Sequence, residues 1–357
     1  MDYFDKLKEN EHEQLVFCYN KQANLKAIIA IHNTSLGPAI GGTRMWTYAT
    51  TGIAVKDVLR LSKGMTYKAA IAGLNLGGGQ AVIIGDAEKD KNELLFRTFG
   101  KFVDSLGGRY ITAEDVGTDV RDMEYVKMET PYVTGISKAL GGSGDPTPVS
   151  AYGVYIGMKA CAKERWGNDS LEGKKIVVQG AGRVAKHLCE HLAGEGANLI
   201  VTDISESKLK RLAEKIDFEA VDPDEVYDVE GDIFAPTALG GILNDETIPR
   251  LKFEIVAGGA NNQLEDEKKH GKMLLEKGIL YAPDYVINSG GLINVANELG
   301  GYRQDRALKQ AESIYYIMTN VLKLSEKLNI PTNEASNMLA EERLNKIGGM
   351  KKIFTRK

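Results

Sequence analysis

Hydrophobic positions in the first part of the chain follow two different periods. Residues 25–32 (LKAIIAIH) and 81–84 form short, continuous apolar runs, which predict buried strands. Residues 55–63 and 91–105 carry apolar side chains three and four positions apart, which predicts helices with one apolar face. Residues 14–130 therefore mix strands with helices.

A short segment with little capacity for regular structure follows. Residues 140–148 (LGGSGDPTP) contain three glycines and two prolines, so we expect a linker there. Strands and helices then alternate, and the chain ends in a helical pattern with a break at Pro331. The expected elements are a helix at about 151–164, a strand at 175–179, a helix at 183–195, a strand at 198–202, a helix at 205–215, short apolar runs at 232–235, 253–257 and 279–281, and helices over 304–347. This alternation predicts a parallel, doubly wound sheet.

Composition narrows the class of protein. The chain has 357 residues, which is comfortable for two domains, and a formal net charge of −4. It has no basic block, so nucleic acid is not an expected partner, and no apolar run long enough to span a membrane. Residues 1–11 lack the apolar core of a signal peptide. Cys18, Cys161 and Cys189 are odd in number and far apart, which predicts buried free thiols in a reducing compartment and hence a cytoplasmic protein.

A dinucleotide-binding fingerprint opens the alternating part. The β-branched run at 176–178 leads into residues 180–185 (GAGRVA), which match G-x-G-x-x-A. In this motif Gly180 permits a tight turn, Gly182 lets a pyrophosphate approach the backbone, and Ala185 lets the helix pack close to the strand. The free N–H groups at the start of the helix favour phosphate.

The acid at the end of the next strand favours NAD as the cofactor. Asp203 stands 21 positions after Gly182, where a carboxylate accepts hydrogen bonds from both ribose hydroxyls and repels a 2′-phosphate. Arg183 leaves NADP open, since it would suit a phosphate. A domain that binds another nucleotide, or none, is the remaining alternative. Residues 187–191 (HLCEH) match the spacing of some zinc peptidases, but the glycine motif already uses this helix, so we expect no metal site.

Three polar features of the first part suggest acid–base chemistry. Lys68 is a candidate cation for a substrate carboxylate, or else a surface lysine. Glu114 and Asp115 follow an apolar segment directly and are candidate proton carriers, or else a helix-capping pair. The three consecutive glycines at 77–79 are costly without a reason. We interpret them as a loop that brings its backbone close to another group.

Several stretches together resemble a known family. They are LGPAIGGTRMW, MTYKAAIAGLNLGGGQAVIIGD, RYITAEDVGTD, YVTG, the glycine-proline linker, VQGAGRVA, VTDI, DIFAPTALGGI, GANNQL and YAPDYVINSGGLINVANE. In this order they resemble the leucine, valine and phenylalanine dehydrogenases of the glutamate dehydrogenase superfamily, most of all the leucine enzymes. The resemblance runs from about residue 12 to 345.

The resemblance implies an α/β enzyme with two domains and its active site in the cleft between them. Such enzymes interconvert an L-amino acid with its 2-oxo acid and ammonia, using NAD, and are homo-oligomers, an octamer or a dimer. The implied substrate-binding and oligomerisation domain covers 1–139, with about 328–357 returning to it. A doubly wound Rossmann domain for NAD covers 145–327.

The resemblance also assigns roles to single residues. Lys68 matches the lysine that binds the substrate carboxylate, and Asn262 matches the asparagine that helps it, although the adjacent Asn261 leaves this register open. Asp115 matches the proton-shuttling aspartate. The other substrate-site positions are Gly41, Gly42 and Met65, with an apolar side-chain pocket of Ile40, Ala113, Leu292 and Val295. The cofactor set is Ser150, near the nicotinamide amide, with Gly180, Ala181, Gly182, Arg183, Val184, Ala185, Lys186, Asp203 and Ile204.

One position departs from the family pattern. Family members have lysine after the three glycines, as the general base, whereas this chain has Gln80. An amide does not take up a proton near neutral pH, although it donates hydrogen bonds. We therefore expect impaired catalysis, whether the glutamine is natural or engineered. The alternatives are a catalytically silent NAD-binding protein, an aromatic substrate, or a related imine or amine chemistry. Lys68 disfavours an amine without a carboxylate, because its charge would have no partner.

Overall fold

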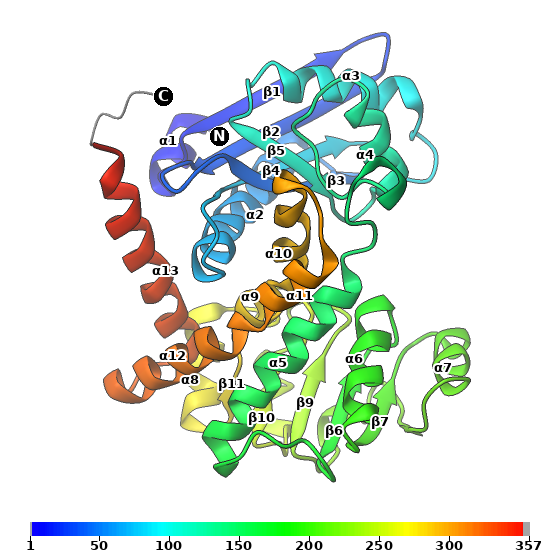
Figure 1. Cartoon of the computed structure of the whole chain (residues 1–357), viewed down its shortest axis with the longest axis vertical. Helices are drawn as coiled ribbons and strands as arrows, with labels where there is room; N and C mark the ends of the chain where they lie inside the picture. The colour runs from blue at the N-terminus through cyan, green and yellow to red at the C-terminus, as the bar shows by residue number, and fades with distance from the viewer. Residues whose placement is uncertain (1, 353–357) are drawn as a thin grey trace. The chain divides into compact units, whose positions relative to one another are not determined.

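A computed structural model of the chain describes residues 2–352 and divides into two compact units (Figure 1). Unit 1 comprises residues up to Asp145, Val295–Gln304 and the residues from Ala340 onward. Unit 2 comprises Pro146–Asn294 and Asp305–Leu339. Three helices, α10 (Gly290–Ala296), α11 (Gln304–Ala311) and α13 (Thr332–Gly348), each contain a point where the chain passes from one unit to the other.

Unit 1 is built on a five-stranded sheet with the strand order β1-β2-β4-β3-β5. Strands β3, β4 and β5 are parallel to one another, whereas β2 is antiparallel to both β1 and β4. The elements are α1 (Tyr3–Glu9), β1 (Gln14–Asn20), β2 (Leu25–Asn33), β3 (Ala39–Trp46), α2 (Thr51–Ile71), β4 (Gly77–Ile84), α3 (Glu93–Asp104), β5 (Tyr110–Glu114), α4 (Val120–Lys127), and the 3-10 turns η1 (Lys138–Leu140), η4 (Asn297–Gly300) and η5 (Gly349–Lys352).

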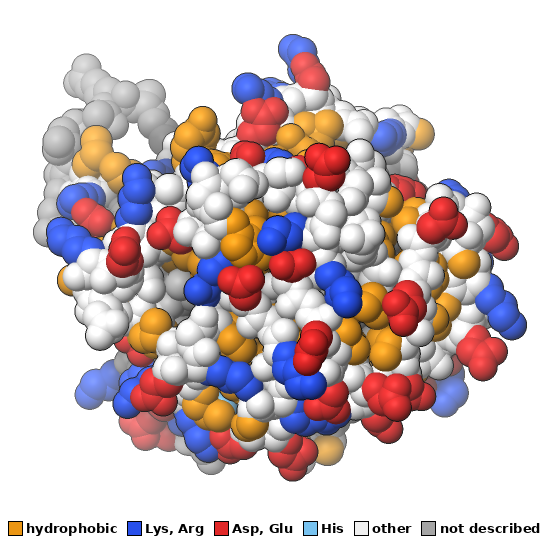
Figure 2. Space-filling model, turned by 90° about the horizontal axis from the view of Figure 1, so that it is seen from below, with side chains coloured by type: hydrophobic (Ala, Val, Ile, Leu, Met, Phe, Trp, Pro, Cys, Tyr) orange, Lys and Arg blue, Asp and Glu red, His pale blue; other side chains and the backbone are white. Residues whose placement is uncertain are grey.

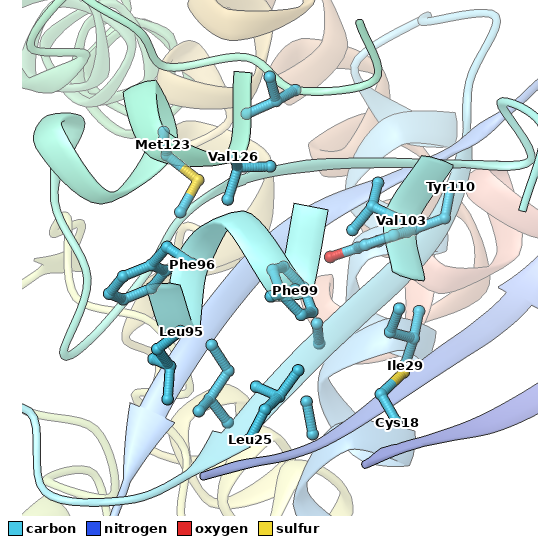
Figure 3. Close-up of a cluster of buried hydrophobic side chains, with 14 of the residues drawn as sticks. Cys18, Leu25, Ile29, Leu95, Phe96, Phe99, Val103, Tyr110, Met123 and Val126 are labelled. Carbon is cyan, nitrogen blue, oxygen red and sulfur yellow. The ribbon is translucent and has the colours of Figure 1, made fainter. Parts of the chain in front are cut away.

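Both faces of this sheet are buried, which explains why β2 is a continuous apolar run rather than an alternating one. Ile29 and its same-face neighbours pack with Phe96 and Phe99 of α3 and with Met123 of α4, in the cluster of Figure 3. Ile28 and the other residues of the opposite face pack against the apolar face of α2. Unit 1 is therefore a sheet between two helical layers.

Unit 2 holds a six-stranded sheet in the order β11-β10-β9-β6-β7-β8, with all pairs parallel. The elements are α5 (Thr147–Trp166), β6 (Lys175–Gln179), α6 (Arg183–Gly194), β7 (Asn198–Thr202), α7 (Glu206–Ala213), β8 (Glu219–Ala220), η2 (Val226–Asp228), β9 (Ile233–Pro236), η3 (Ile248–Arg250), β10 (Ile255–Val256), α8 (Glu267–Glu276), β11 (Leu280–Tyr281), α9 (Asp284–Ile287), α10, α11 (Gln304–Ala311), α12 (Ser313–Leu328) and α13. Strand order reverses direction at β6, so the sheet is doubly wound, and the predicted α/β class is confirmed.

Local chemistry explains most of the element boundaries. The predicted linker is shorter than expected, because α5 begins at Thr147 and contains Pro148 in its first turn, where proline is tolerated. Helix α2 is longer than the predicted 55–63, since Thr50 caps its N-terminus and the apolar face continues to Ile71.

The positions at which the chain passes from one unit to the other also differ from the prediction. A return to unit 1 was expected at about residue 328. Instead Asp305–Leu339 belong to unit 2, because α12 packs against α5 and α9. Residues 295–304 join unit 1, where the Glu298 carboxylate accepts hydrogen bonds from the backbone N–H of Gly135 at 3.0 Å and of Ser143 at 2.8 Å.

The glycine run 77–79 is not a loop, as the sequence suggested, but the start of β4. Each position requires glycine, because another group lies too close for a side chain. A Cβ at Gly77 would lie 2.0 Å from the Asn33 carbonyl oxygen, one at Gly78 would lie 2.1 Å from the Thr66 backbone nitrogen, and one at Gly79 would lie 2.7 Å from the Tyr110 ring. The run allows α2 and the adjacent strands to approach β4, and it positions the residue that follows.

Three further predictions concern membrane spans, surface charge and the cysteines. No helix within residues 2–352 is long and apolar enough to cross a membrane. Acidic and basic side chains are interspersed on the face that Figure 2 shows. Cys18, Cys161 and Cys189 are buried free thiols, as predicted.

Candidate active site

Three parallel strands bring the predicted acid–base residues together in unit 1. Strand β3 lies between β4 and β5, so Gly42 stands opposite Ala113 of β5, next to the Asp115 that follows that strand. Gln80 occupies the fourth position of β4, directly after the glycine run. These residues form one cluster, which we call the Gln80 cluster: Gly42, Arg44, Asp57, Gln80 and Asp115.

Gln80 is almost fully buried, at 3% exposure, and both ends of its amide are bonded. Its Nε2 donates to Asp115 Oδ2 at 2.8 Å, and its Oε1 accepts from the Gly42 backbone N–H at 3.0 Å. The donor end therefore faces a carboxylate and the acceptor end faces an N–H. The site thus uses the glutamine as a bridge between β3 and the end of β5.

Asp115 is also paired with Arg44, a residue that sequence reasoning missed. Arg44 Nε lies 3.2 Å from Asp115 Oδ2, and Arg44 Nη1 lies 3.0 Å from Asp57 Oδ2. Burial on its own would lower the pKa of Arg44, but Asp115 and Asp57 raise it overall. The only signal in the sequence was a single cation within the strand, which does not identify its partners.

Asp57 is the other anchor of Arg44. It also accepts hydrogen bonds from the Tyr48 hydroxyl at 2.7 Å and from Arg60 at 3.1 Å. Burial would raise the pKa of Asp57, but Tyr48, Arg60 and Arg44 lower it overall, so the carboxylate is charged at neutral pH. The Arg44 and Gln80 side chains both contact Asp115 at Oδ2, and the Asp115 side chain is 26% exposed. Oδ2 is therefore held by two groups, and part of the Asp115 side chain is open to solvent.

A buried tyrosine supports the glycine pair from the core. Tyr110 belongs to the apolar cluster of Figure 3, and its hydroxyl donates to the carbonyl oxygens of Gly41 at 3.1 Å and Gly42 at 2.9 Å. Burial raises the pKa of Tyr110, so the hydroxyl stays protonated as a donor. A Cβ at Gly41 would lie 1.7 Å from the Gly79 carbonyl oxygen, and one at Gly42 would lie 2.6 Å from Asp115 Cβ. Both positions therefore require glycine.

The remaining predicted substrate residues lie in both units. Lys68 stands half-buried in the last turn of α2, one turn after the half-buried Met65. Ile40 and Ala113 are buried in the sheet of unit 1. Leu292 and Val295 are buried in α10, where Leu292 belongs to unit 2 and Val295 to unit 1. All four predicted pocket positions are thus apolar and at most 7% exposed.

The two candidate asparagines differ in how they are held. Asn261 Oδ1 accepts a hydrogen bond from Asn288 Nδ2 at 2.8 Å. Asn262 has a left-handed backbone, with φ of 53°, and its carbonyl oxygen accepts from the Gly241 N–H at 2.7 Å. Gln263, fully buried, shapes this turn by donating to the carbonyl oxygens of Gly258 and Ala260. Sequence reasoning missed Gln263 and Asn288, which support the turn rather than carry a recognisable motif.

The predicted dinucleotide turn has the expected local shape in unit 2. Gly180 follows β6 with φ of 107°, and a Cβ there would lie 2.9 Å from Ala238 Cβ. Gly182 is the N-cap residue of α6, no side chain caps the helix there, and a Cβ at Gly182 would meet nothing within 4 Å. Space is therefore open at a helix N-terminus, which is what a pyrophosphate requires.

Asp203 is fixed at the end of β7. Its carboxylate accepts from the backbone N–H of Ala181 and of Ser205, each at 2.8 Å, and lies 3.6 Å from Lys208 Nζ. Burial would raise the pKa of Asp203, but these two N–H groups and Lys208 lower it overall. A charged Asp203 fits NAD, since it disfavours a 2′-phosphate. The unit 2 residues therefore fit this dinucleotide.

The other predicted cofactor residues surround the same turn or lie on α5. Ala181 and Ala185 are buried, Val184 and Lys186 are half-buried, and Arg183 is exposed. Ile204 is 91% exposed, beside Asp203. Ser150 Oγ donates to the Pro146 carbonyl oxygen at 3.1 Å in the first turn of α5.

The histidine pair on α6 makes ordinary protein contacts. His187 Nδ1 lies 2.8 Å from Glu190, and the His191 ring stacks on Tyr155 with centroids 5.2 Å apart. Within residues 2–352, no group of three or more His, Cys, Asp or Glu side chains is arranged to hold a metal ion.

The sequence matches two family models along most of its length. Residues 12–132 match the Glu/Leu/Phe/Val dehydrogenase dimerisation domain, and residues 141–208 and 201–348 match Glutamate/Leucine/Phenylalanine/Valine dehydrogenase. The chain therefore belongs to the Glu/Leu/Phe/Val dehydrogenase family.

Individual relatives are similar over the full length. The chain is 60% identical to leucine dehydrogenase from Thermoactinomyces intermedius, over 96% of this chain and 94% of that protein. It is 58% identical to leucine dehydrogenase from Bacillus subtilis, over 97% and 95%. Among solved structures, L-tryptophan dehydrogenase from Nostoc punctiforme superposes with a TM-score of 0.84 and 47% identity, covering 97% of this chain and 99% of that one.

Proposed function

We propose that the chain catalyses the NAD-dependent oxidative deamination of a branched-chain L-amino acid, namely leucine, valine or isoleucine, to its 2-oxo acid and ammonia, and the reverse reaction. The observation that carries this proposal is the full-length similarity to leucine dehydrogenases, at up to 60% identity. The apolar character of Ile40, Ala113, Leu292 and Val295 supports it, because a branched aliphatic side chain suits apolar surroundings.

In this proposal, unit 2 holds the dinucleotide. The open N-terminus of α6 at Gly182 would receive the pyrophosphate, and Asp203 would accept the ribose hydroxyls. NAD, when bound, supplies the hydride acceptor. The charge of Asp203 argues for NAD over NADP.

Unit 1 supplies the groups for substrate binding and proton transfer. Lys68 would pair with the substrate carboxylate, helped by Asn262 or Asn261. Asp115, whose side chain is 26% exposed, would move protons, while Arg44 and Gln80 hold its Oδ2. Gln80 stands where the family has its general base, and its amide does not serve as one. We therefore propose an enzyme whose turnover is limited by Gln80.

The assembly and location follow from the same relationship. The matched dimerisation domain supports a homo-oligomer, and we propose a dimer or an octamer. The cytoplasmic location stays a prediction that rests on the dispersed free cysteines.

Restoring the lysine tests the proposal. NADH formation is measured with L-leucine, L-valine and L-phenylalanine, for the protein and for Gln80→Lys. We expect Gln80→Lys to raise turnover of the aliphatic substrates by about 10²–10⁴-fold, the usual contribution of a general base. A gain below about tenfold contradicts the base assignment, and a preference for L-phenylalanine contradicts the aliphatic assignment.

The presence of glutamine rather than lysine at position 80 also favours one alternative, a catalytically silent NAD-binding protein. That protein would bind NADH, detected by its fluorescence, yet turn over no amino acid even as Gln80→Lys. The same two proteins therefore separate the proposals.

A further inference from the structure

We propose that Gln80 has a second effect, beyond the absence of a base: its amide oxygen occupies a substrate-binding N–H, that of Gly42. An oxygen of the 2-oxo acid would bind this N–H, and it must first displace Gln80 Oε1. This inference rests on the proposed function, since it concerns the same site.

The first observation is a gap in the sheet. In the pairing of β3 with β4, Ile40 is opposite Gly78 and Thr43 is opposite Ala81. The register is the same at both positions, but Gly41 and Gly42 between them have no partner in β4. A gap in a parallel ladder leaves backbone groups that need another partner. For the Gly42 N–H that partner is the Gln80 side chain, at 3.0 Å.

The second observation is that the amide is locked in this position. Gln80 is 3% exposed, and its Nε2 is held by Asp115 Oδ2 at 2.8 Å. Turning the amide to free the Gly42 N–H would place an oxygen against the Asp115 carboxylate, which is unfavourable. Gln80 therefore competes with any ligand for Gly42 rather than yielding to it freely.

The third observation is the chemistry of the neighbourhood. Gly42 is half-buried and lies beside Asp115, whose side chain is 26% exposed, so this part of the cluster is not deep in the core. A lone backbone N–H binds an oxygen acceptor, and the proposed 2-oxo acid offers carboxylate and carbonyl oxygens. A protonated lysine at position 80 has no acceptor atom and would leave this N–H available.

Binding of one 2-oxo acid to variants at position 80 tests the inference. The full chain is titrated with 4-methyl-2-oxopentanoate in the presence of NADH and without ammonia, so that amination does not occur, and binding is followed by calorimetry. Methionine keeps the length of glutamine but offers no comparable acceptor. We expect Gln80→Met to bind the 2-oxo acid about fivefold to tenfold tighter, the equivalent of one displaced hydrogen bond.

A matched control and a kinetic comparison exclude a simple packing effect. Gln80→Glu retains an oxygen that accepts from the Gly42 N–H, so its affinity should not exceed that of the unchanged protein. Gln80→Met should lower KM without recovering kcat, whereas Gln80→Lys should recover kcat. Urea unfolding of each variant verifies that the fold is retained.

The outcomes separate the two proposals. If Gln80→Lys binds and turns over substrate but Gln80→Met binds no tighter than the unchanged protein, the inference about Gly42 is wrong and the proposed function stands. Equal tightening by Gln80→Met and Gln80→Glu also overturns it. If no form binds the 2-oxo acid, Gln80→Lys included, the proposed function fails and the inference fails with it.

Discussion

The two glycine-rich segments of the chain meet opposite physical demands. In unit 1, residues 77–79 form the start of β4, and a Cβ on each would lie within 2.7 Å of a neighbouring atom. In unit 2, Gly182 stands at the N-cap of α6 in open space, with nothing within 4 Å of an added Cβ. One segment uses glycine to let protein approach protein. The other leaves open space at a helix N-terminus, where we propose that the dinucleotide binds.

The difference carries over to the rest of each site. The Gln80 cluster of unit 1 is held by partly buried pairs between different strands, so its geometry is coupled to the stability of the unit. The nucleotide turn of unit 2 rests on local backbone shape, with Gly180 at φ of 107° and Asp203 tied to the Ala181 N–H. Substitutions should therefore affect stability in the first region and ligand affinity in the second.

The largest effect is expected from Gly78→Ala. A Cβ there would lie 2.1 Å from the Thr66 nitrogen and 2.5 Å from Thr66 Cα, both backbone atoms of α2. Helix and strand must separate, and we expect unit 1 to lose about 3 kcal/mol or more. Urea unfolding measures the loss.

The two tryptophans make the measurement specific to a unit. Trp46 lies in unit 1 and Trp166 in unit 2, so Trp166→Phe leaves a fluorescence reporter for unit 1 and Trp46→Phe leaves one for unit 2. Gly64→Ala, on the same helix α2 but with open space around its Cβ, is the matched control and should be neutral or slightly stabilising. Equal stability of Gly78→Ala and the control would contradict the packing argument.

A smaller loss of unit 1 stability is expected at acidic pH. His32 is 7% exposed, with Nδ1 2.7 Å from the Thr66 hydroxyl and Nε2 3.0 Å from the Asn10 carbonyl oxygen, and its ring lies 4.7 Å from that of His12. Burial, with a contribution from His12, lowers the pKa of His32 from 6.5 to about 4, although the Asn10 carbonyl opposes the shift.

The sign of the pH dependence follows from proton uptake. Between pH 6.5 and about 4 the unfolded chain binds a proton at His32 that the folded chain does not. The free energy of unfolding should therefore fall as the pH falls through this window, by up to about 3 kcal/mol, with no further loss from this group below it. His32→Gln should flatten the dependence seen by the Trp46 reporter. The half-exposed His187→Gln in unit 2 is the comparison, and a flattening of the same size there would count against His32.

The contrast also explains which features the sequence predicts. The G-x-G-x-x-A turn was predicted with its strand and helix because every residue that it requires is local. The run 77–79 was interpreted as a loop, since the reasons for its glycines are Asn33, Thr66 and Tyr110, which are distant in sequence.

Contacts between residues that are distant in sequence also limited the prediction of the candidate site. Lys68, Gln80 and Asp115 were selected from motifs, but the bridge from Gln80 to Gly42 and Asp115 depends on the order of three strands. Arg44 was missed because a single arginine in a strand does not reveal that two carboxylates, Asp57 and Asp115, flank it.

The smallest of these effects is expected at Gly182. A methyl group there meets no protein atom within 4 Å, and the φ of −75° suits alanine, so Gly182→Ala should leave the unfolding of unit 2 unchanged within about 0.5 kcal/mol. The same methyl group would occupy the space proposed for the pyrophosphate, and we expect NADH to bind about tenfold more weakly, roughly 1.4 kcal/mol.

NADH fluorescence titration measures the affinity, and Gly194→Ala, at the other end of α6 and equally open, serves as the control. Because NADH binds the folded state, its thermal stabilisation of unit 2 should shrink in Gly182→Ala alone. Unchanged NADH affinity in Gly182→Ala would mean that the open space above α6 is not where the dinucleotide lies, and the contrast between the two glycine segments would then reduce to packing in one and mere tolerance in the other.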